Sequence, residues 1–320
     1  RKEHYFALWR DSIVFSQWVG VLEIEGLVIE ILPKAEQSRE DRKGADLTEK
    51  WRRILLALLM KSGYIGLRDL DDASMHIQHK NLLDILFERF LNEVEILISE
   101  GLLKKYRSVS RDRYAVKGRI DHTRNLINTI VHAERTRTIA FEYDRITLPD
   151  LILYAAIEAT NRYAPSPYTR GRANSILMYF TDFPAQKIFP SDFTKLRYNR
   201  KTDRYKPSML LARLILGRQN PDLVRGDEHV FSILFDMNEL WEKAIFARLK
   251  HECAKTSNIE IRSQRKKVFW NSNDGLEKTI RPDILIFQQN VPPIVIDTKW
   301  KVLKNSEPSD QDLRQIFAYE

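Results

Sequence analysis

Two short sequences near the end of the chain combine residue types that can hold a divalent cation beside a phosphate. Arg281-Pro282-Asp283 precedes an apolar run, and Asp297-Thr298-Lys299 follows another. Mg²⁺ prefers oxygen ligands and keeps several waters when one or two carboxylates bind it. A lysine beside it can position water or stabilise charge on a phosphate. These sequences therefore predict phosphodiester hydrolysis that depends on Mg²⁺, with Mn²⁺ as a substitute.

The elements that must position these residues are two apolar strands of an antiparallel hairpin within residues 282–300. Asp297 and Lys299 are two apart on a strand, so they point to one face. With a turn centred near Val291, we expect Asp283 to lie opposite Lys299 and diagonal to Asp297. Charges among apolar strands are costly unless they pair or bind a metal, so the geometry favours a site.

Three further groups are candidates for the same site. Glu242, on the predicted helix before these strands, could bind the metal or orient the lysine, and Gln315, on the helix after them, could position water. The backbone carbonyl of Thr298 could add a metal ligand. The alternative is a simple surface ion pair between Asp297 and Lys299, which is common at strand ends and contributes little.

The joint pattern resembles the PD-(D/E)xK nuclease superfamily through Pro282-Asp283 and Asp297-Thr298-Lys299. Within that superfamily, residues 235–242 look like the helix motif of the McrC family, the nuclease subunit of 5-methylcytosine-specific restriction systems. Further matches to that family lie at Gly20–Lys34, Lys117–Asp121, Arg204–Lys206 and Gln315–Tyr319.

The resemblance implies that Asp283, Asp297 and Lys299 are catalytic, with Glu242 in support. It implies a cytoplasmic, Mg²⁺-dependent endodeoxyribonuclease of antiviral defence, which cuts double-stranded DNA carrying modified cytosine. It also implies a partner, an AAA+ GTPase motor like McrB, on which the chain docks and whose GTP hydrolysis it stimulates. The chain has no G-x-x-x-x-G-K-[ST] phosphate loop, so we expect no bound nucleotide on it.

Two other functions stay open at this point. A non-cutting adaptor would bind the GTPase ring and raise its turnover, with residues 1–115 carrying that activity alone. A stand-alone nuclease of the same superfamily, of the repair type, would cleave DNA without any nucleoside triphosphate.

The composition is that of a folded protein without a membrane anchor. The 320 residues are 43% hydrophobic and 30% charged, which excludes wholesale disorder, and no apolar run is long enough to cross a membrane. Cys253 has no second cysteine to pair with, which excludes an internal disulfide framework and fits a reducing cytoplasm. The net charge of +8 is compatible with a nucleic-acid partner but does not establish one.

We expect an α+β multidomain fold in three parts. Residues 1–115 form a β-rich arm with a hairpin and helices for motor binding, 116–225 a basic helical region, and 226–320 an α/β nuclease core with a mixed sheet flanked by helices. Since related nucleases continue past the final helix, we expect this core to be truncated. Apolar periodicity predicts helices at 47–60, 81–101, 149–163, 169–180, 205–216, 238–253 and 310–320, with two short basic strands within 102–116.

Basic residues concentrate in two stretches, 104–119 and 187–218. Such residues neutralise phosphates without reading base sequence. The alternatives are a solvated face or a contact with an acidic motor subunit. In the second stretch we expect DNA contacts from Arg197, Arg200, Lys201, Arg204 and Lys206.

Overall fold

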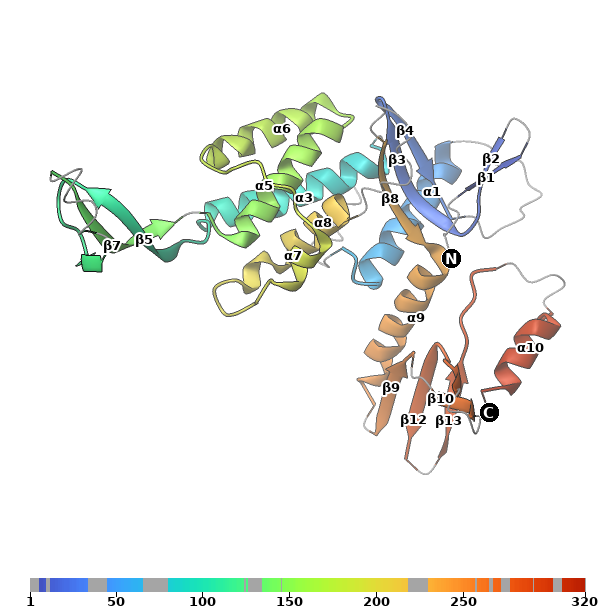
Figure 1. Ribbon diagram of the computed structural model, residues 1–320. Helices are drawn as coiled ribbons and strands as arrows, with labels where there is room; N and C mark the ends of the chain where they lie inside the picture. The colour runs from blue at the N-terminus through green and yellow to red at the C-terminus, as the bar shows by residue number, and fades with distance from the viewer. Residues whose placement is uncertain are drawn as a thin grey trace. The chain divides into compact units, whose positions relative to one another are not determined.

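The protein folds as two compact units, Arg1–Leu86 with Arg218–Glu320, and Phe87–Gly217. Helices and small antiparallel sheets make up both, so the expected mixture of α and β structure is confirmed (Figure 1). The division into three functional parts at residues 115 and 225 stays a prediction. The computed structural model describes residues 6–9, 12–33, 45–65, 80–123, 125, 134–144, 146–217, 230–256, 258–264, 267–271, 277–289, 291–301 and 307–319.

An antiparallel sheet joins the beginning of the chain to its last third. The predicted hairpin is present as β3 (Trp18–Ile24) and β4 (Leu27–Ile31), and β8 (Val230–Asp236) pairs with β3 on the other side. Glu25 and Gly26, which connect the hairpin strands, have φ values of 49° and 89°. Two residues of positive φ match the twist of the flanking strands, which explains the tight turn.

One carboxylate of this sheet holds two helices in place. Glu30 on β4 accepts hydrogen bonds from Arg52 Nη2 at 2.6 Å and Nε at 3.1 Å, and also from the backbone N–H of Leu82. Arg52 lies on α1 (Ala45–Lys61), and Leu82 is the first residue of α3 (Leu82–Ser99). Both charged side chains are about nine-tenths buried, so this ion pair is an internal link between β4, α1 and the start of α3.

Helix α9 (Met237–Cys253) follows β8 directly and carries the chain to the last sheet (Figure 1). The Asp236 carboxylate caps it by accepting a hydrogen bond from the first turn. Tyr64 anchors the helix at its start. Its hydroxyl donates to Glu239 at 3.2 Å and accepts from Lys243 at 2.9 Å. These contacts fix the helix that bears Glu242.

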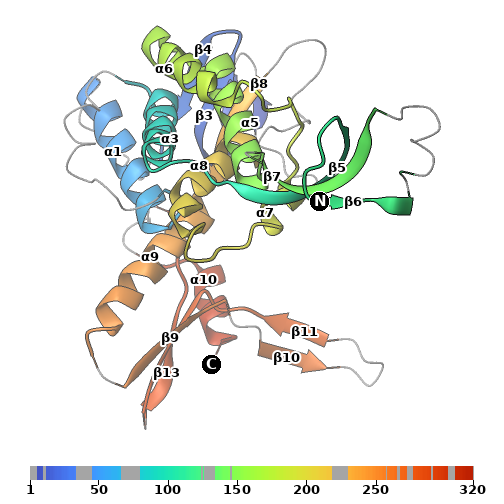
Figure 2. The ribbon, with the colours of Figure 1, turned by 90° about the vertical axis from the view of Figure 1, so that its left-hand side faces the viewer.

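The last sheet has the order β13-β12-β9 and is antiparallel in every pairing that the described residues show. The prediction of a mixed sheet is therefore wrong for this part of the chain. Parallel neighbours need a long crossover connection, whereas only two residues separate β12 from β13, and a second ribbon lies between β9 and β12 in the sequence. The strands are β9 (Ile259–Ser263), β12 (Ile284–Gln288) and β13 (Val291–Ile296), while β10 (Lys267–Asn271) and β11 (Glu277–Ile280) form that ribbon (Figure 2).

The second unit contains a sheet where mostly helix was expected. β5 (Lys105–Arg113) is one long strand, not two short ones, and it pairs with β7 (Thr136–Asp144), which in turn pairs with β6 (Arg119–Ile120). Opposite charges face each other across β5 and β7, with Arg137 Nε 3.8 Å from Asp112 Oδ1. The basic strand β5 continues over its whole length because β7 carries complementary charges opposite it. A local sequence pattern does not reveal this pairing, because β7 lies much later in the chain.

The helices predicted at 149–163, 169–180 and 205–216 are present to within a few residues, whereas the short helix Pro190–Thr194 was not predicted. No helix in the described ranges is both long and apolar enough to cross a membrane. Besides most of α3, the described helical segments of this unit are α5 (Leu148–Tyr163), α6 (Pro167–Leu177), η2 (Met178–Phe180), α7 (Pro190–Thr194), η3 (Asp203–Tyr205) and α8 (Lys206–Gly217). The last described helix of the first unit is α10 (Asp310–Phe317).

A carboxyl group is fully buried in the second unit. Asp150 accepts a hydrogen bond from the Tyr205 hydroxyl at 2.8 Å and another from the Thr147 hydroxyl. The Tyr205 oxygen in turn accepts from the Leu103 N–H at 2.8 Å. Burial raises the pKa of Asp150 from 3.8 to about 6, although the hydrogen bonds from Thr147 and Tyr205 act in the opposite direction.

The free energy of unfolding should therefore depend on the protonation of Asp150. Because its pKa is higher in the folded state, the folded state binds the extra proton, and stability falls as pH rises from about 3.8 to about 6. The loss is about 3 kcal/mol over that interval. Asp150→Asn should remove this contribution, so the free energy of unfolding of the variant relative to that of the wild type, measured with urea, should rise between pH 4 and pH 7. A difference between the two proteins that does not change with pH would contradict the assignment.

Candidate active site

The hairpin register brings two carboxylates to the same end of the last sheet. Ile284 pairs with Ile296, so Asp283 immediately precedes this pair and Asp297 immediately follows it. The predicted placement of Asp283 opposite Lys299 is therefore wrong. The register centres the hairpin one residue before Val291, and moving the centre by one residue changes the residue opposite Asp283 by two positions, from Lys299 to Asp297.

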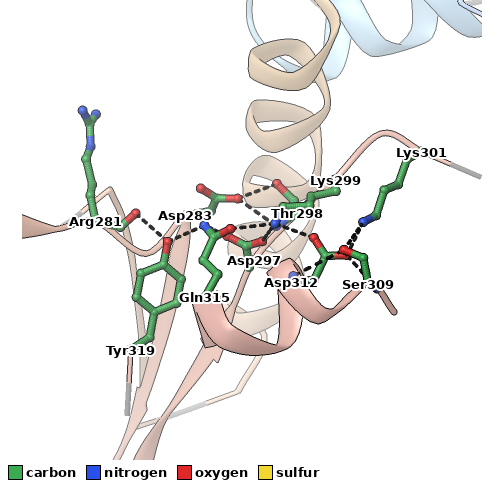
Figure 3. Close-up of polar contacts among 10 residues, drawn as sticks. All are labelled: Arg281, Asp283, Asp297, Thr298, Lys299, Lys301, Ser309, Asp312, Gln315 and Tyr319. Carbon is green, nitrogen blue, oxygen red and sulfur yellow. Dashed lines mark hydrogen bonds and ion pairs between the residues drawn. The ribbon is translucent and has the colours of Figure 1, made fainter. Parts of the chain in front are cut away.

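Hydrogen bonds from Thr298 hold the Asp283 carboxylate. Its Oδ2 accepts from the Thr298 backbone N–H at 2.7 Å and from the Thr298 hydroxyl at 3.0 Å. The Asp283 carbonyl accepts from the Gln264 N–H at 2.9 Å, at the end of β9. Thr298 was expected to contribute only its carbonyl oxygen. The structure gives its amide and hydroxyl an additional role, which is to orient a neighbouring carboxylate (Figure 3).

Lys299 lies at the centre of a polar network (Figure 3). Its Nζ is 3.0 Å from Asp297 Oδ2, 2.8 Å from Asp312 Oδ1 and 2.7 Å from Gln315 Oε1. Gln315 closes the network by donating to Asp297 Oδ1 at 2.9 Å. The Asp297 side chain is only 5% exposed and that of Lys299 is 32% exposed. Burial lowers the pKa of Lys299, but its bonds to Asp312 and Asp297 outweigh that effect and raise the pKa above its ordinary value.

Asp312 is a member of this network that the sequence reasoning missed. It lies in the first turn of α10 and accepts hydrogen bonds from Ser309 N and Oγ, from Lys299 and from Lys301. The two lysines and Ser309 hold its pKa far below the ordinary range. The Ser-x-x-Asp capping box at 309–312 was a usable signal. It places Asp312 one helical turn before Gln315, on the same face.

Tyr319, which follows α10, contacts the segment that leads into β12 and contains Asp283. Its hydroxyl accepts from Gln315 Nε2 at 2.7 Å and donates to the Arg281 carbonyl at 3.4 Å. The residue is 8% exposed. Gln315 is therefore fixed by Tyr319 on one side and by Asp297 and Lys299 on the other.

Glu242 lies beside this network but has a different partner from the one expected. It accepts a hydrogen bond from Gln264 Nε2 at 2.7 Å, and not from Lys299. Partial burial raises its pKa, and the negative charge of Asp283 raises it further. Since the backbone of Gln264 also bonds to Asp283, Gln264 connects α9 to the carboxylate end of the sheet.

The donor set suits a cation that keeps part of its water shell. No group of three or more acidic, histidine or cysteine side chains within the described ranges could by itself enclose a metal ion. Mg²⁺ is commonly held by one or two carboxylates together with waters, which Asp283 and Asp297 can provide. The Thr298 carbonyl is adjacent in sequence to Asp297. The residues present therefore fit Mg²⁺, whereas they do not fit a closed zinc site.

The five basic residues expected to contact DNA fall into two groups. Arg204 bonds to the carbonyl of Glu100 and, at 3.2 Å, to its carboxylate, while Lys206 pairs with Asp203 at 2.7 Å and lies over the Tyr198 ring. These two side chains have partners within the protein. The remaining three, Arg197, Arg200 and Lys201, are exposed.

Comparisons with known proteins were made on sequence and on structure. The family model described as McrBC 5-methylcytosine restriction system component matches residues 13–320. A comparison with curated proteins finds no match.

Two solved structures resemble the fold. A chain in a refined half-complex from the tetradecameric assembly of Thermococcus gammatolerans McrB AAA+ hexamers with bound McrC has a TM-score of 0.76 and 19% identity, covering 98% of this chain and 70% of that one. A chain in the cryo-EM structure of the Thermococcus gammatolerans McrBC complex has a TM-score of 0.62 and 17% identity, covering 79% of this chain and 72% of that one. At these identities the likeness shows a shared fold.

Proposed function

Because the chain belongs to the family of McrBC 5-methylcytosine restriction system components, we propose that it is the DNA-cutting subunit of such a system. It would be a Mg²⁺-dependent endonuclease that cuts double-stranded DNA carrying modified cytosine. The observation that carries this proposal is the partly buried network of Asp297, Lys299 and Gln315 beside Asp283. A surface ion pair would not need the amide and helix contacts that surround Lys299.

The proposed partner is an AAA+ GTPase motor. One of the similar solved structures contains McrB AAA+ hexamers with bound McrC. The proposal extends that association to this chain, which would dock on a McrB-like motor and stimulate its GTP hydrolysis.

Each residue of the site has a proposed role. Asp283 and Asp297, with the Thr298 carbonyl, would hold Mg²⁺, which when bound supplies Lewis-acid activation of water and of the phosphate. The Lys299 ammonium group lies beside the Asp297 carboxylate. From there it would stabilise charge on the phosphate. Glu242 would support the site through Gln264, which bonds to it at 2.7 Å.

Gln315 would orient two groups at once. Its amide oxygen accepts from Lys299 and its amide nitrogen donates to Asp297, so one planar side chain sets the direction of both. Rigid support of this kind keeps the reacting groups in place without reorganisation during the reaction.

The test is a cleavage assay of the protein together with its motor partner. Duplex DNA with 5-methylcytosine should be cut in the presence of GTP and Mg²⁺, with Mn²⁺ as a substitute, and EDTA should abolish cutting. Unmodified duplex is the matched control and should stay intact. Stimulated GTP hydrolysis without any nick would show a non-cutting adaptor instead. Cutting without any nucleoside triphosphate would show a stand-alone nuclease.

A further inference from the structure

The second unit contains a cavity of about 620 Å³ that the proposed cleavage chemistry does not use. It lies between the start of β5, the N-terminal end of α5 and the segment 195–202. Four cationic residues line it, and no acidic residue of the described chain does so. These cationic residues are Lys104, Lys195, Arg197 and Lys201.

A fixed turn presents two of these cations. Asn199 Oδ1 accepts from the N–H groups of Lys201 at 2.9 Å and Thr202 at 3.1 Å, and the Thr202 hydroxyl donates to the Arg197 carbonyl at 3.1 Å. Lys195 is partly neutralised, because it pairs with Asp192 at 2.8 Å. Within the described part of the chain, the charged ends of Arg197 and Lys201 have no hydrogen bond or ion pair. Their charges are therefore available to a ligand.

The rest of the cavity offers an apolar wall with one aromatic ring. Tyr106, which is 64% exposed, lines it together with Ile146, Leu148 and Leu196. The first residue of the 16-residue helix α5, Leu148, is part of this wall, so the positive end of the helix dipole is close to the cavity. The volume is that of pockets that take small organic ligands. An anionic ligand with a flat apolar part fits this cavity, with its charge at the cationic residues and its flat part against the apolar wall.

We propose that the cavity binds one nucleotide of a single-stranded nucleic acid, with the phosphate at Arg197 and Lys201 and the base against Tyr106. Sites for single strands combine cations that follow the backbone with aromatic rings on which bases stack. A base within a duplex is stacked between its neighbours and would have to leave them to enter such a cavity. This site consists of residues of the second unit, and it does not depend on cleavage by residues of the first.

The charge contribution can be tested by the salt dependence of binding. The full chain would be titrated against a fluorescent single-stranded oligonucleotide of thymidines, in EDTA so that no cleavage occurs. Removing one phosphate contact should reduce the slope of log K against log salt by about 0.7, which is about a fivefold loss at 0.1 M salt. We expect this for Lys201→Ala and for Arg197→Ala. The control is Arg162→Ala, because Arg162 is exposed in the last turn of α5, about 20 Å along the helix from the cavity.

The aromatic contribution is tested with Tyr106→Ala. Loss of base stacking should weaken binding by about 5- to 150-fold and leave the salt slope unchanged. Tyr179→Ala is the control, because Tyr179 is 65% exposed in the same unit and does not line the cavity. Unchanged melting temperatures would show that these exposed side chains were removed without unfolding the protein.

Three results would overturn the proposal. One is an equal loss of affinity in Lys201→Ala and Arg162→Ala, since net charge alone would then explain binding. Another is unchanged affinity in Tyr106→Ala. The third is binding of a duplex, or of deoxythymidine monophosphate, as tight as that of the oligonucleotide, which would exclude a site for a single strand.

Discussion

Asp297→Asn is expected to reduce DNA cleavage by about a thousandfold or more while leaving motor binding unchanged. The substitution keeps the size of the side chain but removes the charge that faces Lys299 at 3.0 Å and that would hold the cation. Lys299 keeps Asp312 and Gln315 as partners, so the fold around it should hold. The measurement is the single-turnover cleavage rate on modified duplex with the motor, GTP and Mg²⁺. Stimulation of GTP hydrolysis by the variant serves as the control for docking.

The same assay separates the proposed mechanism from a general disturbance of the site. Lys299→Ala should abolish cleavage as Asp297→Asn does, and wild-type cleavage by a folded double variant would refute the assignment.

Asp312→Asn should give a smaller loss, because the amide oxygen can still accept from Lys299. Its matched control is Asp310→Asn, which removes an exposed charge from the same first turn of α10 and should leave the rate unchanged.

Glu30→Ala is expected to lower the free energy of unfolding by about 3–5 kcal/mol. Glu30 and Arg52 are 13% and 14% exposed, and removing the carboxylate leaves a largely buried guanidinium without its partner. The Leu82 N–H at the start of α3 loses its acceptor as well. Urea unfolding of the variant and the wild type measures the difference. Glu30→Gln should cost less, because its single amide oxygen can still accept from Arg52 Nε and from the Leu82 N–H.

A surface ion pair on the same helix provides the control for this prediction. Glu49 pairs with Arg53 one turn along α1, where the arginine side chain is 50% exposed. Pairs of this kind contribute less than about 1 kcal/mol, so Glu49→Ala should have little effect. A loss in Glu30→Ala no larger than that in Glu49→Ala would show that the internal link between β4, α1 and α3 is not a source of stability.

Much of the local structure could be predicted from apolar periodicity and turn residues. The hairpin before Pro33, helix α9 and the apolar strands of the last sheet follow from the residues at those positions. The expected proximity of Asp297 and Lys299 is present, with the two side chains 3.0 Å apart, but the strand that was to carry them is shorter than predicted, because β13 ends at Ile296. These features depend on neighbours within a few residues, and such neighbours are visible in the sequence.

Two differences from the prediction concern partners that lie far apart along the chain. Whether residues 105–113 form one strand was decided by β7, about 30 residues later, and the N-terminal hairpin gained a third strand from β8, more than 200 residues away. A hairpin centre one residue away from the expected position changed the residue opposite Asp283. Complementary charges and main-chain hydrogen bonds determine which strands pair and in which register. A local sequence pattern does not contain this information.

The sequence by itself determined which residues could do chemistry, because carboxylate, lysine and amide groups at strand and helix ends follow from residue type and spacing. Only the tertiary structure decided how they are held. In the folded chain, Asp312 and Gln315 on α10 accept hydrogen bonds from Lys299, and Thr298 donates to Asp283. Glu242 is connected to the sheet through Gln264. The physical reason is that a buried charge needs several partners at once, and packing of separate elements supplies them.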